Sequence, residues 1–442
     1  MAAAVLHETD KNAKVLYTYQ TLVDVGPQSE AGWRGIAIQP VGVRGGLTRA
    51  LARASSGVNP DSADFKGILA GVGALGSALA EIWIREAWGS WTLADPDILF
   101  PHNVVRHLAR HDAIGKFKVE AVKQCLGATR EPSEVQIDGV PEDVRSEKLH
   151  EHLASADFIV DVSTTLAVPR DLSRRSVPGR LASTFLTPSG LDSVLLLEPE
   201  DHAVRLDALE AQYYRAVINS DWGARHLIGH AGNLWVGAGC RDLSVVLSQE
   251  LVSLHAATIA RQLRRLRDSG DGQIRIWSLD DASGTLNAHT SRVAAAERLT
   301  RGGWEIVWDA DTRAKLGDYR QKCLPSETGG VILGYIDHKA KAIYIVDVLP
   351  APFDSEGDAT GFVRGVDGLE KRVFDVAKRT ANIVGYVGEW HSHPPFTPPA
   401  PSALDFTLIG KLAESLALDG HPAVMMIVGE GGEVTISLAE LQ

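Results

Sequence analysis

The stretch FKGILAGVGALGSALAEIWIREA, residues 65–87, most limits the folds open to this chain. It begins with an apolar run of strand length, continues through Gly71, Gly73 and Gly76, and ends with apolar residues at helical spacing. A buried strand that turns directly into a helix starts a βαβ unit, and such units build parallel sheets. The stretch therefore predicts an α/β domain with a Rossmann-like, doubly wound and mostly parallel sheet.

Strand and helix patterns keep alternating up to a long helical run at about 245–267. After GGWEIVWDA a second series of strand and helix patterns begins, which indicates a mixed α/β domain. A chain of 442 residues is long enough for two or three domains. We predict an N-terminal extension of unassigned role at 1–64, the first domain at 65–270, a linker at 271–303 with a helix near 290–299, and the second domain at 304–442.

The net charge is −12 and the basic residues form no dense block, which argues against a nucleic-acid partner. The three cysteines, Cys125, Cys240 and Cys323, are scattered, which favours a reducing, cytoplasmic location over a disulfide framework. The first residues lack the apolar segment of a secretory signal, and no apolar run reaches the length of a membrane span.

The glycine loop lies where backbone amides and a helix dipole can bind phosphate oxygens. Asp95, at the end of the next predicted strand, can bind ribose hydroxyls. Taken alone, these residues also fit a tight turn without a ligand, or a NAD enzyme. Four further polar residues follow within one short run: Asp97, Asn103, Arg106 and Lys118.

In this order, the glycine loop, Asp-x-Asp, Asn-x-x-Arg and a later lysine resemble the ThiF/MoeB/HesA adenylyltransferases, which are similar to ubiquitin-activating enzymes, over about 66–270. The resemblance implies ATP and Mg²⁺ as cofactors, a homodimer, and adenylation of a carboxylate. Arg106 and Lys118 would neutralise charge on the α-phosphate while Asn103 fixes the geometry. Mg²⁺ would be held through Asp161 or Asp97 and the phosphates, because Thr164 stands where these enzymes usually carry a further acid that helps to hold the ion. A degenerate nucleotide-binding scaffold therefore stays as an alternative.

Many relatives of this type pass the acyl group to a cysteine. Cys240 follows two glycines, adjoins Arg241 and precedes the helical run, and both a cation and a helix N-terminus lower the pKa of a thiol. Cys240 is therefore a candidate for a thioester, although a small buried apolar role is equally consistent with its setting.

His391 and His393 are two residues apart at the end of an apolar strand pattern, so both rings project to one face. Asp405, brought back by a helix that starts at Ser402, completes three ligands for zinc and leaves a position for water. Ser402 and Asp405 also form a helix capping box, and the two interpretations are compatible. Glu389 shares a strand face with His391, which makes it a second candidate acid.

The motifs ETGG with Glu327, HSHP, and Ser-x-x-Asp together resemble the JAB/JAMM (MPN⁺) metalloproteases over about 304–442. The resemblance implies that Glu327 is the general base and then acid, that Ser402 stabilises an oxyanion, and that zinc is bound by His391, His393 and Asp405. The spacer from His393 to Ser402 has eight residues, one more than the usual pattern of the family.

Together the two resemblances imply a bifunctional bacterial enzyme of the kind found in ubiquitin-like conjugation or antiphage operons. One domain would activate the C-terminus of a ubiquitin-like protein, and the zinc isopeptidase would trim its precursor or cleave its conjugates. An E2-like conjugating protein is a further expected partner. The alternative is a ThiF/MoeB-like activator of a sulfur-carrier protein, with a JAB domain that trims this carrier.

Overall fold

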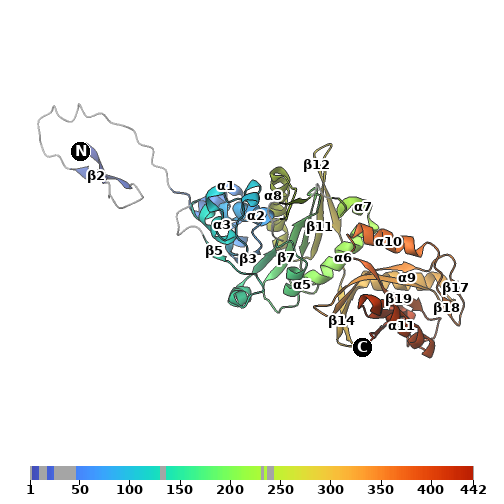
Figure 1. Ribbon diagram of the computed structural model, residues 1–442. Coiled ribbons are helices and arrows are strands. Elements are labelled where there is room, and N and C mark those ends of the chain that lie inside the picture. The colour runs from blue at the N-terminus through green and yellow to red at the C-terminus, as the bar shows by residue number, and fades with distance from the viewer. Residues whose placement is uncertain are drawn as a thin grey trace, which may run out of the picture. The chain divides into compact units, whose positions relative to one another are not determined.

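The computed structural model describes residues 2–8, 17–23, 46–129, 136–229, 233–235 and 243–441. The chain divides into two compact units, Met1–Gly46 and Leu47–Gln442. In the first unit, β1 (Ala2–Glu8) pairs antiparallel with β2 (Tyr17–Val23). The second unit contains two large sheets and the helices that cover them (Figure 1).

The first large sheet has eight strands in the order β12-β11-β8-β7-β6-β3-β4-β5. The strands from β7 to β5 are parallel, whereas β8, β11 and β12 extend the sheet antiparallel. This order confirms the predicted doubly wound α/β fold. The strands are β3 (Lys66–Ala70), β4 (Ser90–Ala94), β5 (Ile137–Val140), β6 (Phe158–Asp161), β7 (Arg180–Leu186), β8 (Asp192–Leu197), β11 (Gln273–Asp280) and β12 (Thr285–Ser291).

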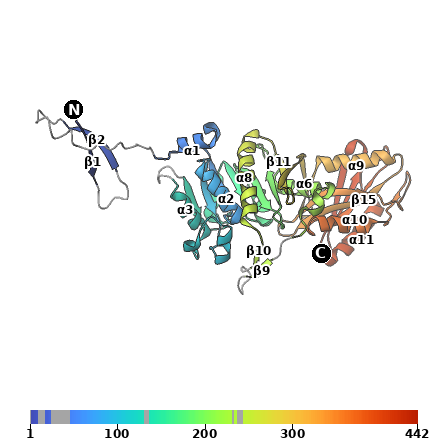
Figure 2. The same ribbon diagram turned by 90° about the horizontal axis from the view of Figure 1, so that it is seen from above.

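Helix α2 (Ala74–Arg85) follows the glycine loop and packs beside α8 (Gln249–Leu266) (Figure 2). Its helical apolar spacing buries one face, where Trp83 stacks on Trp91 of β4 with ring centroids 4.7 Å apart. The other helices here are α1 (Arg49–Ser56), α3 (Lys118–Gly127), α4 (His150–Ser155), α5 (Ala167–Leu172), α6 (Leu206–Asn219) and α7 (Gly223–His226). Short strands β9 (Asn233–Trp235) and β10 (Leu243–Val245) pair with each other.

The second large sheet is mixed, with seven strands in the order β13-β14-β16-β15-β19-β20-β21. Its strands are β13 (Ala296–Arg301), β14 (Trp304–Asp309), β15 (Gly329–Asp337), β16 (Ala342–Pro350), β19 (Gly385–Ser392), β20 (Ala423–Val428) and β21 (Val434–Ala439). The helices are α9 (Ala310–Cys323), α10 (Leu369–Arg379) and α11 (Ala403–Leu416), and a small hairpin pairs β17 (Glu356–Gly357) with β18 (Phe362–Val363). A mixed α/β architecture follows the α/β sheet, as predicted.

The predicted helix near 290–299 was wrong, and the structure also differs from the predicted bounds of the linker and of the N-terminal extension. The expected helix near 290–299 is absent from these described residues, because β12 and β13 occupy the segment and pair with β11 and β14. The expected linker at 271–303 therefore completes the first sheet and begins the second. Residues 47–64, assigned to an N-terminal extension, belong to the compact second unit and include α1.

The two sheets share a buried interface. Asp207 of α6 is almost fully enclosed and accepts hydrogen bonds from both terminal nitrogens of Arg298 on β13, at 3.0 and 2.6 Å. Tyr214 of α6 packs edge-on against Tyr335 of β15, with ring centroids 5.8 Å apart. Both sheets therefore contribute to one continuous core.

Among the helices of the described residues, none combines the length and the apolar character needed to cross a lipid bilayer.

Candidate active sites

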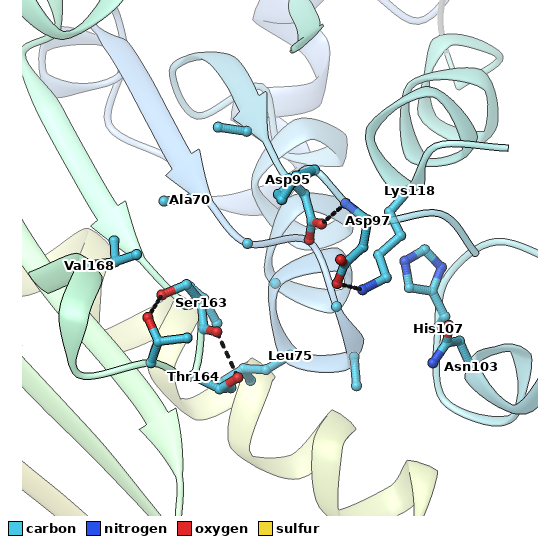
Figure 3. Close-up of a pocket in the computed structure, with 18 of the residues that line it drawn as sticks. Ala70, Leu75, Asp95, Asp97, Asn103, His107, Lys118, Ser163, Thr164 and Val168 are labelled. Carbon is cyan, nitrogen blue, oxygen red and sulfur yellow. Dashed lines mark hydrogen bonds and ion pairs between the residues drawn. The ribbon is translucent and has the colours of Figure 1, made fainter. Parts of the chain in front are cut away.

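A cavity of about 870 Å³ lies at the carboxyl ends of the parallel strands, where β3 lies between β4 and β6 (Figure 3). This is the point at which chain order reverses, the usual ligand site of an open α/β sheet. Among the residues lining it are the predicted nucleotide-site residues Gly71, Gly73, Gly76, Asp95, Asp97, Asn103, Arg106 and Lys118.

The three glycines differ in whether the structure leaves room for a side chain. Gly71 has φ +89°, and a Cβ there would lie 2.8 Å from the carbonyl oxygen of Val162. A Cβ on Gly76 would lie 2.0 Å from the carbonyl oxygen of Gly71, so helix α2 packs directly on the loop. Gly73, by contrast, precedes α2 and a Cβ there would meet nothing within 4 Å. The first turn of α2 is therefore open to an anion.

Asp95 braces the glycine loop. Its buried carboxylate accepts the N–H of Val72 at 2.8 Å through one oxygen and the N–H of Asp97 at 2.9 Å through the other. Burial raises the pKa of Asp95, and Lys118 opposes that shift. Ribose binding by Asp95 stays a prediction, and the structure shows that its carboxylate holds the glycine loop.

Lys118 and Arg106 bring positive charge to the cavity. The Lys118 ammonium lies 2.8 Å from Oδ2 of Asp97 (Figure 3). Burial lowers the pKa of Arg106. Asn103 accepts the N–H of Phe100 at 2.9 Å through its side-chain oxygen, which holds the turn that carries both Asn103 and Arg106. The cavity thus combines an open helix terminus with two cations, a setting suited to phosphate.

His107 lines the same cavity and was missed by the sequence analysis. Its Nδ1 accepts the N–H of Ala109 at 3.0 Å, so Nε2 carries the proton and donates to the Val72 carbonyl at 2.8 Å. Burial lowers the pKa of His107 to about 4. Neutral His107 therefore links the Asn103–Arg106 turn to the glycine loop.

Asp161, at the end of β6, is buried beside the cavity and accepts hydrogen bonds from the hydroxyls of Ser163 and Ser183, at 2.6 and 2.8 Å. Burial raises the pKa of Asp161 to about 6, so it is ionised at neutral pH. Thr164 lines the cavity with φ +59°, and its hydroxyl donates to the carbonyl of Ser163. Cys240 lies outside the described residues.

The second site lies where β19 ends and α11 begins. His391 is on β19, His393 follows it, and Asp405 is in the first turn of α11. One ligand atom from each of these side chains lies within 4.8 Å of the other two. Nε2 of His391 is 3.3 Å from Oδ1 of Asp405.

The capping box predicted from Ser402 is present. The Asp405 N–H donates to the Ser402 hydroxyl at 3.2 Å, and the Ser402 N–H donates to Oδ2 of Asp405 at 2.7 Å. These bonds engage one carboxylate oxygen and direct the other, Oδ1, toward His391. The same contacts therefore cap the helix and orient Asp405, the predicted metal ligand.

The donor set fits zinc. A carbonyl oxygen only accepts, so the 2.6 Å contact between Nδ1 of His393 and the Pro398 carbonyl means that Nδ1 carries the proton. In the neutral ring this leaves the lone pair on Nε2 of His393, the tautomer that metal-binding histidines adopt. Two imidazoles and one carboxylate match catalytic zinc sites, which keep one position open.

Glu327 lies just before β15, half-buried near the cluster. Burial raises the pKa of Glu327, the charge of Asp405 adds to this shift, and His393 opposes it. The other candidate acid, Glu389, accepts hydrogen bonds from Arg364 at 2.7 Å and from the Tyr386 hydroxyl at 3.1 Å. The structure therefore gives Glu389 an ion-pair partner that the sequence analysis did not find.

Solved structures similar to this chain include Escherichia coli MccB with ATP and PaaA, each with a TM-score of 0.37. Sequence identity is 15% for MccB and 18% for PaaA. Each match covers 52% of this chain and 64% of the solved chain. The chain thus spans less than two thirds of their length.

The ThiF family model matches residues 56–190, and the model of prokaryotic homologs of the JAB domain matches residues 309–439. A CD-NTase/cGAS isopeptidase of Enterobacter hormaechei subsp. hoffmannii (strain UCI 50) is 35% identical over 126 residues, which cover 28% of this chain and 68% of that protein. One from Escherichia coli (strain TW11681) is 29% identical over 127 residues, covering 28% and 76%. This chain therefore belongs to the JAB isopeptidase-like family that includes these proteins, and it joins that domain to an adenylyltransferase-like ThiF domain.

Proposed function

We propose that this chain adenylates the C-terminal carboxylate of a ubiquitin-like protein with ATP, and that its JAB site cleaves precursors or conjugates of the same protein. The observation that carries the proposal is the presence of both sites in one compact unit: a glycine-loop cavity with paired cations, and a His-His-Asp cluster beside Glu327. Activation and cleavage are consistent with each other when both act on one C-terminal tail.

In the first reaction, a carboxylate oxygen attacks the α-phosphate of ATP and pyrophosphate leaves. The open first turn of α2 would bind phosphate oxygens, and Arg106 and Lys118 would stabilise the added negative charge. Asp161, ionised above a pKa of about 6, would bind Mg²⁺ together with the phosphates. Asp95 and His107 would keep the glycine loop in place.

In the second reaction, His391, His393 and Asp405 would hold Zn²⁺, which supplies Lewis acidity and lowers the pKa of water toward about 7. Glu327 would take the proton of the attacking water and return it to the leaving amine. Its raised pKa makes the Glu327 carboxylate a stronger base for the first step, and a pKa nearer to the working pH lets one group act as base and then as acid. The Ser402 hydroxyl would donate to the oxyanion.

The relatives named CD-NTase/cGAS isopeptidase support an isopeptide bond as the one cleaved, and they suggest a CD-NTase as the conjugated target. We further propose an E2-like conjugating protein as partner, a homodimer formed through the ThiF domain, and a place in antiphage defence in the bacterial cytoplasm. The scattered cysteines favour that compartment.

The adenylation half is tested by ATP–pyrophosphate exchange that depends on a ubiquitin-like protein. We expect exchange with the wild type and its loss in Arg106→Ala. Exchange that is absent with every ubiquitin-like protein tried, or equal in the variant, would contradict this half.

The cleavage half is tested with a ubiquitin-like protein fused through its C-terminus to a fluorescent protein. We expect cleavage by the wild type and none by Glu327→Gln or after treatment with a zinc chelator. Readdition of Zn²⁺ should restore the chelated wild type. Insensitivity to both changes would rule out the zinc isopeptidase.

A thioester at Cys240 is a separate proposal. After incubation with ATP and the ubiquitin-like protein, the wild type should carry an adduct that thiols remove and Cys240→Ala should not. An adduct that persists in the variant would exclude Cys240.

A further inference from the structure

The β17–β18 hairpin, which is labelled in Figure 1, contacts the backbone of Glu327. The Glu327 N–H donates to the Asp358 carbonyl, between the two strands of the hairpin, at 2.8 Å. A Cβ on Gly357 would lie 2.4 Å from the Glu327 carbonyl oxygen, and one on Gly329 would lie 2.5 Å from the Phe362 ring. Since these contacts leave no room for a side chain, the hairpin and Glu327 are positioned together.

Arg364 follows β18 directly and ties the hairpin to the strand of the metal ligands. Its Nη2 and Nε donate to Oε1 of Glu389 at 2.7 and 3.1 Å. The Arg364 side chain is 22% exposed and that of Glu389 is 11% exposed, so the pair is largely shielded from water. Charge-assisted bonds in such surroundings hold their geometry better than solvated ones.

The pairing of β15 with β19 completes the connection between the hairpin, Glu327 and the metal ligands. On β15, Gly329 pairs with His391 and Val331 pairs with Glu389. The hairpin thus contacts the base through Asp358 and the ligand strand through Arg364, while β15 and β19 contact each other directly. Glu389 is two residues from His391, so the anchor point lies close to the ligands.

We propose that Arg364 is a positioning residue of the JAB site, which fixes the hairpin on Glu389 and thereby fixes Glu327 relative to His391. The inference rests on the proposed isopeptidase function. A general base must stay within hydrogen-bond reach of the proton it takes, and a displacement of about 1 Å costs on the order of 100-fold in rate. Removing Arg364 detaches the hairpin from Glu389 and leaves the metal ligands and Glu327 unchanged.

Hydrogen exchange of the full chain tests the positioning without any substrate. In Arg364→Ala we expect the amides of Glu327 and of residues 356–363 to exchange about tenfold faster or more, with β15 and β20 unchanged. Arg364→Lys should restore part of the protection because it keeps the charge. Tyr386→Phe is the matched control, since it removes another donor to the same Glu389 oxygen but leaves the hairpin attached.

Unchanged exchange at Glu327 in Arg364→Ala would overturn the proposal, and so would faster exchange throughout the JAB domain, which indicates general destabilisation. If Arg364→Ala does not fold, Glu389→Ala provides the same test from the other partner, because it removes the oxygen that accepts both Arg364 bonds.

Kinetics with the fluorescent fusion then separate positioning from substrate binding. We expect Arg364→Ala to lower kcat about 10- to 100-fold and to leave KM within about twofold of the wild type. A loss of this size is usual when a residue that orients a metal site, without binding the metal, is removed. A raised KM with unchanged kcat would overturn the proposal by making the hairpin a substrate contact. No cleavage by the wild type would instead refute the proposed function, while the exchange result would still decide the role of Arg364 in the structure.

Discussion

The Lys118 ammonium lies 2.8 Å from Oδ2 of Asp97, with the lysine side chain 13% exposed and the aspartate 42% exposed. The shielded cation is thus held in place at the glycine-loop cavity by residues of this chain. We predict that Lys118→Met lowers the rate of ATP–pyrophosphate exchange by at least about 100-fold, because one preorganised cation facing the transferred phosphate is lost.

Lys123→Met is the matched control for this prediction. Lys123 is on the same helix and pairs with Asp138, but its side chain is 47% exposed and does not line the cavity. Its exchange rate should stay within about twofold of the wild type. Equal exchange rates in Lys118→Met and Lys123→Met would show that Lys118 has no specific role in adenylation.

Ser402 allows the capping and catalytic roles of one hydroxyl to be separated. In Ser402→Ala the N–H of residue 402 still donates to Asp405, but the bond from the Asp405 N–H is lost, which costs about 1 kcal/mol of stability. We predict a change in Zn²⁺ affinity below about tenfold, measured by chelator competition, but a loss of cleavage of about 100-fold. Ser402→Thr should keep the cap and most of the activity. If Ser402→Ala cleaves like the wild type, the hydroxyl only caps the helix.

The candidate sites could be predicted to the extent that their residues lie close together in sequence or follow regular spacing. His391 and His393 share a strand face, and the Ser402–Asp405 box is four residues long, so local geometry brings them together. The contact of His107 with Val72 spans 35 residues and ends on a backbone carbonyl, which leaves no side-chain signature. The partner of Glu389 lies on a hairpin whose packing depends on tertiary structure.

The fold, too, was predicted correctly where burial and hydrophobic period agree, and incorrectly near 290–299. The strand, glycine turn and helix of residues 65–87 were predicted because burial and period agree there. The segment near 290–299 contains three consecutive alanines, Ala294–Ala296, and helix propensity favoured a helix. Pairing of β13 with β14 overrides that weak preference. The two strands are joined by Gly302 and Gly303, both with positive φ, and this Gly-Gly turn is a local hairpin signal that the helix prediction overlooked.

Arg170 should be important for the stability of both domains. It donates to Glu210 at 2.6 and 2.8 Å, lies 4.6 Å from the Tyr335 ring centroid, and is 3.5 Å from Asp337. We predict that Arg170→Met costs about 3–5 kcal/mol in the free energy of unfolding, because Glu210 would be left buried without its partner. Urea denaturation measures this cost.

The exposed pair of Lys322 and Asp318 provides the comparison for Arg170, with side chains 67% and 56% exposed. Lys322→Met should cost less than about 1 kcal/mol, since solvated pairs contribute little. Similar costs for the two variants would mean that the Arg170 pair is solvated.

From the burial of His107 we predict that the folded protein loses stability as the pH falls. Burial holds its pKa near 4 in the folded protein, against an ordinary value of 6.5. Between these values the unfolded chain binds a proton that the folded protein does not, so stability rises with pH and is lost as pH falls from 6.5 toward 4. One such proton changes the free energy of unfolding by about 1.4 kcal/mol per pH unit.

Urea denaturation at pH 7 and pH 5 should therefore show a loss in the wild type that exceeds the loss in His107→Gln by about 2 kcal/mol. Glutamine keeps a donor toward the Val72 carbonyl but does not titrate, so the comparison isolates the proton. The control is His111→Gln, at an exposed histidine that does not line the cavity, and this variant should show the wild-type loss. A His107→Gln variant that loses as much stability as the wild type would mean that His107 is protonated in the folded protein. In that case Nε2 could still donate to Val72, but Nδ1 could not accept from Ala109, and the link between the turn and the glycine loop would have to be weaker than the structure indicates.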